Sequence, residues 1–177
     1  MTSRSITGLV LAALLAVPAA AQAQAKSSGG SGVWLGGAFG LESGEDFSGY
    51  KLRFEGEVPV VRLSQTVQVY GVGAISYAGL SHDVSVLTLV PAARLNWSAS
   101  REIGAYGDVG LGFYHAWVSG GSSDSGATMR FLAGGYYEMR PTTRFFVEAG
   151  LNPYFGDFGG DSSLTTFTLM IGAKFRI

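Results

Sequence analysis

The sequence predicts an all-β protein, an eight-stranded antiparallel up-and-down β-barrel that crosses a membrane. Three observations predict it: a short apolar segment near the N-terminus resembles an export signal, eight later segments alternate apolar and polar residues, and the charges of these segments share one register. Because successive side chains of a strand point to opposite faces, each segment has one apolar face and one polar face.

The N-terminal segment predicts export and not anchoring. Arg4 precedes the apolar run 9–21 (LVLAALLAVPAAA), and Ala23-Gln24-Ala25 has the small-x-small pattern of a cleavage site. A transmembrane helix needs about 20 apolar residues, so this run is too short. We therefore expect a signal peptide at 1–25, a flexible lead-in at 26–32 and the barrel at 33–177.

The eight alternating segments are separated by turn-forming residues. In chain order they are 33–41, 49–62, 67–77, 85–97, 103–117, 127–139, 145–155 and 164–177.

The first three segments differ in how clearly they alternate. In 33–41 (VWLGGAFGL), the register that starts at Val33 is mostly apolar. In 49–62 (GYKLRFEGEVPVVR), one face carries four consecutive charges, which cannot face lipid. The segment 67–77 (VQVYGVGAISY) is rich in glycine, and its register stays ambiguous because apolar residues occupy both faces.

Each of the other five segments has an apolar register opposed to a register that carries charge. The charged positions are Arg94 in 85–97, Asp108 in 103–117, Arg130 and Glu138 in 127–139, Glu148 in 145–155, and Lys174 in 164–177. The last segment (LTTFTLMIGAKFRI) alternates up to the final residue, as expected for a strand that closes a barrel against the first strand.

The distribution of charge decides which face is inside. A soluble barrel would place its apolar register inside, but the polar register here is too charged for a core. It contains Lys51, Arg53, Glu55, Glu57, Arg94, Asp108, Arg130, Glu138, Glu148 and Lys174. The nearly uncharged opposite register therefore predicts lipid outside and a polar lumen inside.

An eight-stranded barrel is just wide enough to be filled by side chains, and buried charges must be paired. We therefore expect a network of ion pairs to close the lumen, in preference to a conducting pore. Counting residues along neighbouring segments places Arg94 near Asp108 across the fourth and fifth segments, and Lys174 near Glu148 across the seventh and eighth.

Connections and aromatic residues predict the orientation. Short turns follow the second, fourth and sixth segments and should face the periplasm, with Arg62, Arg101, Arg140 and Arg144 beside them. Longer outer loops such as 119–126 and 156–163 join the other pairs. Aromatic girdles are expected at the two rims, from Trp97, Phe145 and Phe175 at the periplasmic rim, and from Tyr50, Tyr77, Trp117 and Phe155 at the outer one.

With these features the chain resembles the small outer-membrane β-barrel family that includes the OmpA transmembrane domain and OmpX-like proteins. The resemblance rests on the eight-strand pattern and on Phe175-Arg176-Ile177, which looks like the C-terminal signal (Phe175, Ile177) read by the barrel assembly machinery. It implies a place in the outer membrane of a Gram-negative bacterium, with outer-membrane lipids, lipopolysaccharide and the assembly machinery as partners. The function we expect is that of a non-catalytic integral protein that supports membrane integrity or surface interaction. A narrow, porin-like solute or ion channel is the alternative.

A lipid A-modifying enzyme is less favoured by the sequence. His82 lies in Ser81-His82-Asp83, but adjacent loop residues rarely converge into a catalytic site. His115 falls in the lipid register, and lipid A deacylases, which look similar in size, pair their histidine with a serine two residues on, where this chain has Trp117. We expect no catalytic residues and no cofactor.

Other ligands can be weighed in the same way. The net charge of −1 gives no electrostatic case for nucleic acid, and without cysteine there are no thiolate metal sites. The outer loops are expected to carry Glu42, Glu45, Asp46, Asp83, Asp124, Asp157 and Asp161. These acids could share divalent cations with lipopolysaccharide phosphates, although simple solvation is the alternative.

The glycine pairs in 71–73 and 110–112 indicate barrel curvature and close packing and not phosphate loops.

Overall fold

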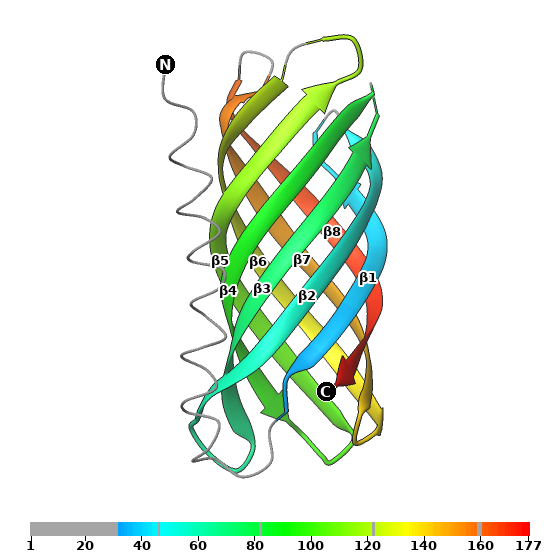
Figure 1. Cartoon of the computed structure of the whole chain (residues 1–177), viewed down its shortest axis with the longest axis vertical. Helices are drawn as coiled ribbons and strands as arrows, with labels where there is room; N and C mark the ends of the chain where they lie inside the picture. The colour runs from blue at the N-terminus through cyan, green and yellow to red at the C-terminus, as the bar shows by residue number, and fades with distance from the viewer. Residues whose placement is uncertain (1–31, 46, 82, 122, 159–160) are drawn as a thin grey trace.

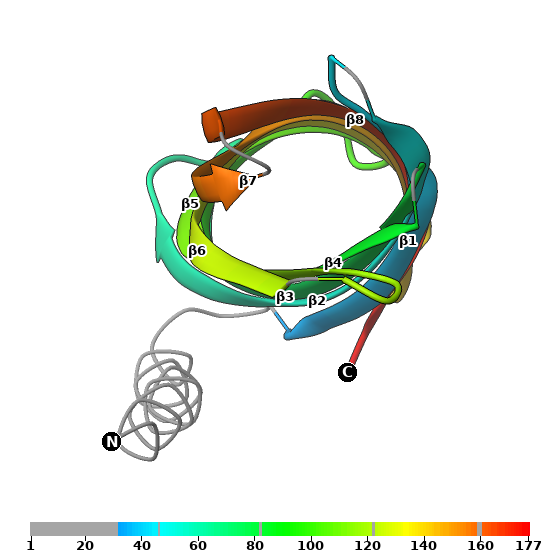
Figure 2. The same ribbon diagram turned by 90° about the horizontal axis from the view of Figure 1, so that it is seen from above.

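The described part of the chain forms a closed barrel of eight antiparallel strands (Figures 1 and 2). The computed structural model describes residues 32–177 except 46, 82, 122 and 159–160, so the expected signal peptide and nearly all of the lead-in lie outside the described residues. The strands are β1 Trp34–Ser43, β2 Ser48–Arg62, β3 Val67–Leu80, β4 Val84–Ser98, β5 Ile103–Val118, β6 Ser123–Arg140, β7 Thr143–Phe158 and β8 Asp161–Arg176. The predicted fold class is confirmed. The described residues include no helix long and apolar enough to cross a membrane.

Every strand pairs with its neighbours in sequence, and β8 closes the ring against β1. The closing register runs from Trp34 opposite Arg176 to Ser43 opposite Phe167. The last strand therefore alternates to its end because both of its edges are paired, which leaves no open sheet edge.

Several strands are longer than the alternation predicted. β6 begins at Ser123, β7 ends at Phe158, and β8 begins at Asp161. The outer loops expected at 119–126 and 156–163 are therefore shorter than predicted, because 123–126 belong to β6, 156–158 to β7 and 161–163 to β8. Small polar residues such as these are compatible with strand pairing where a hairpin extends past the apolar band into water.

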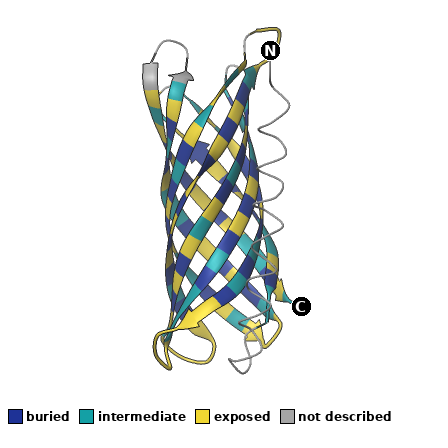
Figure 3. Cartoon of the chain, turned by 60° about the vertical axis from the view of Figure 1, so that its left-hand side comes forward, coloured by how far each residue is buried: buried dark blue, intermediate teal, exposed yellow. Residues whose placement is uncertain are grey.

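The two faces of the barrel have opposite character, as Figure 3 shows by the alternation of buried and exposed positions. Along β5, for example, Leu111 and Phe113 are exposed while Asp108 and Tyr114 are buried in the lumen. The ambiguous register of β3 is resolved in the same way, since Ile75 faces outward and its neighbours face inward. The apolar register is therefore outside.

The close-packing interpretation of the two glycine pairs holds for only one of them. A Cβ at Gly112 would lie 2.1 Å from the carbonyl oxygen of Leu89, whereas a Cβ at Gly73 would have nothing within 4 Å. Gly112 thus permits the close approach of β4 and β5, and Gly73 has no such role in β3.

This difference gives a prediction with an internal control. Gly112→Ala is expected to lower the free energy of unfolding by about 1–3 kcal/mol, because backbone must move to admit the methyl group. Gly73→Ala should be neutral or stabilising by up to about 1 kcal/mol, since it restricts the unfolded chain. Denaturant titration of the two variants compares them, and equal stabilities would contradict this account of Gly112.

Candidate functional site in the barrel lumen

All ten residues predicted to form the lumen network face the inside of the barrel. Nine of them are buried, and Glu138 is partly buried near the periplasmic end. They come from β2, β4, β5, β6, β7 and β8.

Arg94 is the centre of this network. Its Nε donates to Asp108 Oδ2 at 3.1 Å, and its Nη1 donates to Glu55 Oε1 at 2.8 Å and also to Glu57. Arg94 and Asp108 lie directly opposite each other on β4 and β5, so the expected contact is present. Arg130 on β6 bonds the same aspartate, with Nε 3.2 Å from Oδ1. One arginine thereby joins three carboxylates from two strands.

The expected pairing of Lys174 with Glu148 is wrong. Lys174 instead binds Glu55, at 2.5 Å, and Glu57. The strand register explains this. Between β7 and β8, Glu148 lies opposite Met170 and not opposite Lys174. Lys174 of β8 lies opposite Gly36 of β1, which in turn lies opposite Glu55 of β2. A Cβ at Gly36 would lie 2.5 Å from Lys174 Cγ, so the missing side chain leaves room for the lysine to reach β2.

Glu148 finds its partners across the lumen. It forms an ion pair with Arg53 of β2, and it accepts a hydrogen bond of 2.6 Å from the hydroxyl of Tyr106 on β5. Arg53 Nε also lies 2.9 Å from Glu55 Oε2, which links this pair to the Arg94 centre.

The outer end of the lumen is closed by a smaller polar group under an apolar cluster. Glu42 pairs with Lys51 at 3.0 Å and accepts a hydrogen bond of 2.9 Å from the hydroxyl of Tyr154. The expectation that Glu42 belongs to an outer loop is therefore wrong, since it is buried in the register of Trp34 on β1. Apolar side chains pack above this pair, namely Ala78, Leu80, Val84, Val86, Tyr114 and Ala116.

The periplasmic end is closed by cations stacked on aromatic rings. The Arg144 guanidinium carbon lies 4.3 Å from the ring centre of Trp34 and 4.1 Å from that of Tyr136, and Nη2 donates to Glu138 at 3.0 Å. Arg144 lies beside the turn between β6 and β7, as expected, but its side chain is buried in the lumen. The sequence contained a signal for it, since Arg144 shares its register with Glu148.

The acids expected in the outer loops do not gather into a site. Glu45 and Asp83 are exposed, and Asp124 accepts a hydrogen bond of 2.7 Å from the Tyr114 hydroxyl. Asp46 and the side chains of Asp157 and Asp161 lie outside the described residues. Across the described ranges, no three histidine, aspartate or glutamate side chains are grouped so as to hold a metal ion. Binding of divalent cations stays a prediction.

His115 is part of an aromatic row on the outer surface. Its ring stacks on that of Trp117, with the ring centres 5.6 Å apart. The ring of Tyr77 continues the row, since its centre lies 6.2 Å from that of Trp117 and 6.1 Å from that of Tyr50. This row is typical of the interface between lipid and water.

The same histidine has a partner that the sequence reasoning missed. His115 Nδ1 lies 2.7 Å from Ser125 Oγ, because the β5–β6 register places the two residues opposite each other. A serine and a base within hydrogen-bond reach are two parts of a catalytic triad, but no carboxylate among the described residues hydrogen-bonds the imidazole. His82 lies outside the described residues.

Comparison with known proteins identifies the fold. No protein-family model and no curated protein sequence matches the chain. Neisserial surface protein A matches with a TM-score of 0.63 and 13% identity, covering 82% of this chain and 96% of that one. The outer membrane enzyme PagL matches with a TM-score of 0.53 and 15% identity, over 81% and 99% of the two chains. Ail, the attachment invasion locus protein of Yersinia pestis, matches with a TM-score of 0.51 and 18% identity, covering 82% of this chain and 97% of that one.

The fold and the lumen together define a class of protein. The chain is an eight-stranded antiparallel barrel with an apolar outer surface and a charged interior. This is the fold of the small outer-membrane β-barrel proteins, and the solved structures to which it is similar include surface proteins and an enzyme.

Proposed function

We propose that the protein is a non-catalytic integral protein of the bacterial outer membrane, whose lumen is closed by its own side chains. One observation carries the proposal: Arg94 joins Glu55, Glu57 and Asp108 in the middle of a barrel whose outward register is apolar. Lipid on the outside and paired charges on the inside are the arrangement that a transmembrane barrel requires. The role we infer for it is support of membrane integrity or interaction at the cell surface.

The proposed partners follow from the two ends and the outer face of the barrel. Outer-membrane lipids and lipopolysaccharide would contact the apolar band and the aromatic row at Tyr50, Tyr77 and Trp117. The exposed Phe175 and Ile177 lie at the periplasmic end of β8, and their accessibility supports recognition by the barrel assembly machinery.

Conductance distinguishes this proposal from a channel. The refolded barrel is expected to give no stepwise current in planar bilayers, because the ion-pair network and the apolar cluster of β3, β4 and β5 fill the lumen. A general porin inserted into the same bilayers is the positive control. Discrete conductance steps that depend on the concentration of this protein would overturn the closed-lumen proposal and favour the channel.

A lipid-modifying enzyme is the second candidate, and the contact of His115 with Ser125 is the observation that favours it. We expect unchanged masses of lipid A when the protein is overexpressed, because the described contacts provide no acid to orient the imidazole. Ser125→Ala is the matched control. Loss of an acyl chain from lipid A with the wild type, but not with this variant, would establish the enzyme instead.

A further inference from the structure

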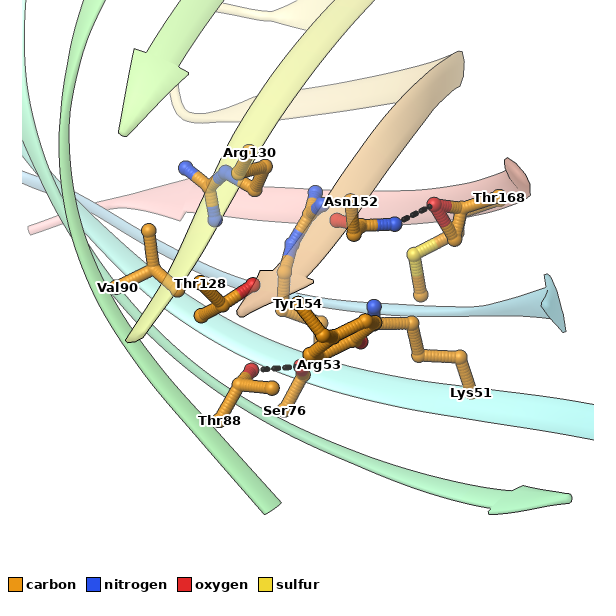
Figure 4. A pocket seen from close by; sticks show the side chains of 11 residues that line it. Lys51, Arg53, Ser76, Thr88, Val90, Thr128, Arg130, Asn152, Tyr154 and Thr168 are labelled. Carbon is orange, nitrogen blue, oxygen red and sulfur yellow. Dashed lines mark hydrogen bonds between the residues drawn. The ribbon is translucent and has the colours of Figure 1, made fainter. Parts of the chain in front are cut away.

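The outer face of the barrel is hollowed across its middle strands. Inside the barrel, the cavity among Lys51, Arg53 and Arg130 in Figure 4 has a volume of about 10 Å³, which is room for one water. A far larger hollow, of about 670 Å³, lies on the outer face of β3 to β7. We call it the lipid-facing hollow, and the outward residues that shape it include Leu95, Gly107, Phe131, Ala133, Ala149 and Leu151.

Small residues form the floor of the lipid-facing hollow, and large ones form its rim. Gly107, Ala133 and Ala149 lie side by side on β5, β6 and β7, because each is opposite the next in the strand register. Leu95 of β4 ends this row on one side, and Phe131 of β6 rises on the side toward the outer end of the barrel. The hollow therefore has an apolar floor and apolar walls, which suits a hydrocarbon chain.

Packing of the sheet does not require the glycine in this floor. A Cβ at Gly107 would have its nearest atom at 3.6 Å, the carbonyl oxygen of Leu132, whereas a Cβ at Gly112 of the same strand would meet backbone at 2.1 Å. Gly135 is equally open, with the nearest atom at 3.8 Å. Larger side chains would fit at both positions, and their absence keeps the hollow open.

The floor continues along β5 and β6 toward the periplasmic rim. Below it, Ala105 lies opposite Gly135, and Ile103 lies opposite Tyr137. Gly107 lies four residues after Ile103. Because a strand rises about 3.3 Å per residue and is tilted by about 40° in such barrels, Gly107 lies roughly 10 Å above the level of Ile103. Half of the hydrocarbon core is about 15 Å thick, so the hollow lies at the depth of an acyl chain of the periplasmic leaflet.

Two exposed arginines flank this periplasmic end. Arg101 lies in the turn between β4 and β5, and Arg140 is the last residue of β6. Neither guanidinium is bound by another described residue, whereas Arg62 in the turn between β2 and β3 donates to two carbonyl oxygens of its own turn. Glu102 is exposed beside Arg101, so two cations against one acid leave this part of the rim positive.

We propose that the lipid-facing hollow binds one anionic glycerophospholipid of the periplasmic leaflet. One acyl chain lies over Gly107 and Ala133, and the phosphate is held between Arg101 and Arg140. A second copy of the barrel is a poor occupant, because its arginines would be brought against these two. The site deepens the proposed function and rests on its membrane setting, but it does not require a closed lumen.

Native mass spectrometry tests the headgroup part of the site. The barrel is equilibrated in detergent with equal amounts of phosphatidylglycerol and phosphatidylcholine that carry identical acyl chains, and it should retain one phosphatidylglycerol. The preference for this lipid should be about 25-fold, at about fivefold for each arginine. Arg101→Gln and Arg140→Gln should each lower the preference about fivefold, and Arg62→Gln should keep it. All three arginines are exposed, so the variants are expected to fold.

A second pair of variants tests the acyl-chain part. Gly107→Leu should fill the hollow and abolish retention of both lipids. Gly73→Leu is the matched control, because Gly73 is also exposed in the outward register, on β3, and a Cβ there would have nothing within 4 Å. It should retain phosphatidylglycerol as the wild type does. Should Gly107→Leu fail to fold, Ala133→Leu fills the same hollow from β6.

Four results would overturn the proposal. Equal retention of the two lipids by the wild type would remove the headgroup site, and an equal loss in Arg62→Gln and Arg101→Gln would assign the preference to net charge. Retention that survives filling of the hollow from β5 and from β6 would place the chain elsewhere. Lipid-free dimers that Gly107→Leu dissociates would assign the hollow to a second copy. None of these results changes the conductance in planar bilayers, so failure of the lipid site and failure of the closed lumen are told apart.

Discussion

Replacing Arg94 with glutamine is expected to lower the free energy of unfolding by about 3–5 kcal/mol. The side chain is 1% exposed and bonds Glu55, Glu57 and Asp108. The variant keeps most of the volume but leaves three carboxylates to share the remaining cations of the lumen. Reversible unfolding in guanidinium, followed by tryptophan fluorescence of the barrel in detergent or vesicles, measures the change.

The control for this variant is Arg140→Gln, at the periplasmic end of β6. Arg140 is exposed, and substitutions at such sites usually change stability by no more than about 0.5 kcal/mol. If Arg94→Gln cost no more than Arg140→Gln, the network would not hold the barrel together.

A charge swap between Arg94 and Asp108 separates a simple pair from a network. Two partners that bonded only each other would regain nearly all stability in the double variant Arg94→Asp/Asp108→Arg. We expect only a partial gain over the single reversal, because Glu55 and Glu57 would still lose the guanidinium that Arg94 places between them. Full recovery would show that the contacts to β2 contribute little.

The strands and the two faces of the barrel follow from the sequence because each depends only on local alternation. Arg94 and Asp108 could be paired as well, since β4 and β5 are joined by a short turn that fixes their register. Lys174 needed one further step of counting, across Gly36 of β1 to Glu55. Counting between adjacent strands alone pairs this lysine with Glu148 of β7.

Other contacts could not be found by counting. The pair of Arg53 with Glu148 crosses the lumen, so it depends on the stagger and tilt of the whole barrel, which alternation along a strand does not determine. The contact of His115 with Ser125 was missed for a different reason. Ser125 was expected in a loop, and it meets the histidine only because β6 begins at Ser123.

Replacing Leu111 with arginine is expected to destabilise the barrel by about 2–4 kcal/mol, the cost of an arginine on the lipid face near the bilayer midplane. Leu111 lies in the middle of β5, its side chain is 61% exposed, and the neighbouring outward residues Val109 and Phe113 are also apolar. An exposed leucine on a soluble protein would accept arginine at little cost. The energy therefore reports which solvent surrounds the barrel, and folding titrations in lipid vesicles measure it.

Leu63 is the control, because its side chain is also 61% exposed but it follows β2 at the periplasmic turn. Equal exposure makes the two substitutions equivalent in water, and only their depth in a bilayer differs. Leu63→Arg should therefore cost about 0–1 kcal/mol in vesicles, as found for charges near the interface. If both variants were equally stable in vesicles, hydrocarbon would not surround the middle of the barrel, and the lumen charges would need another explanation than a lipid exterior.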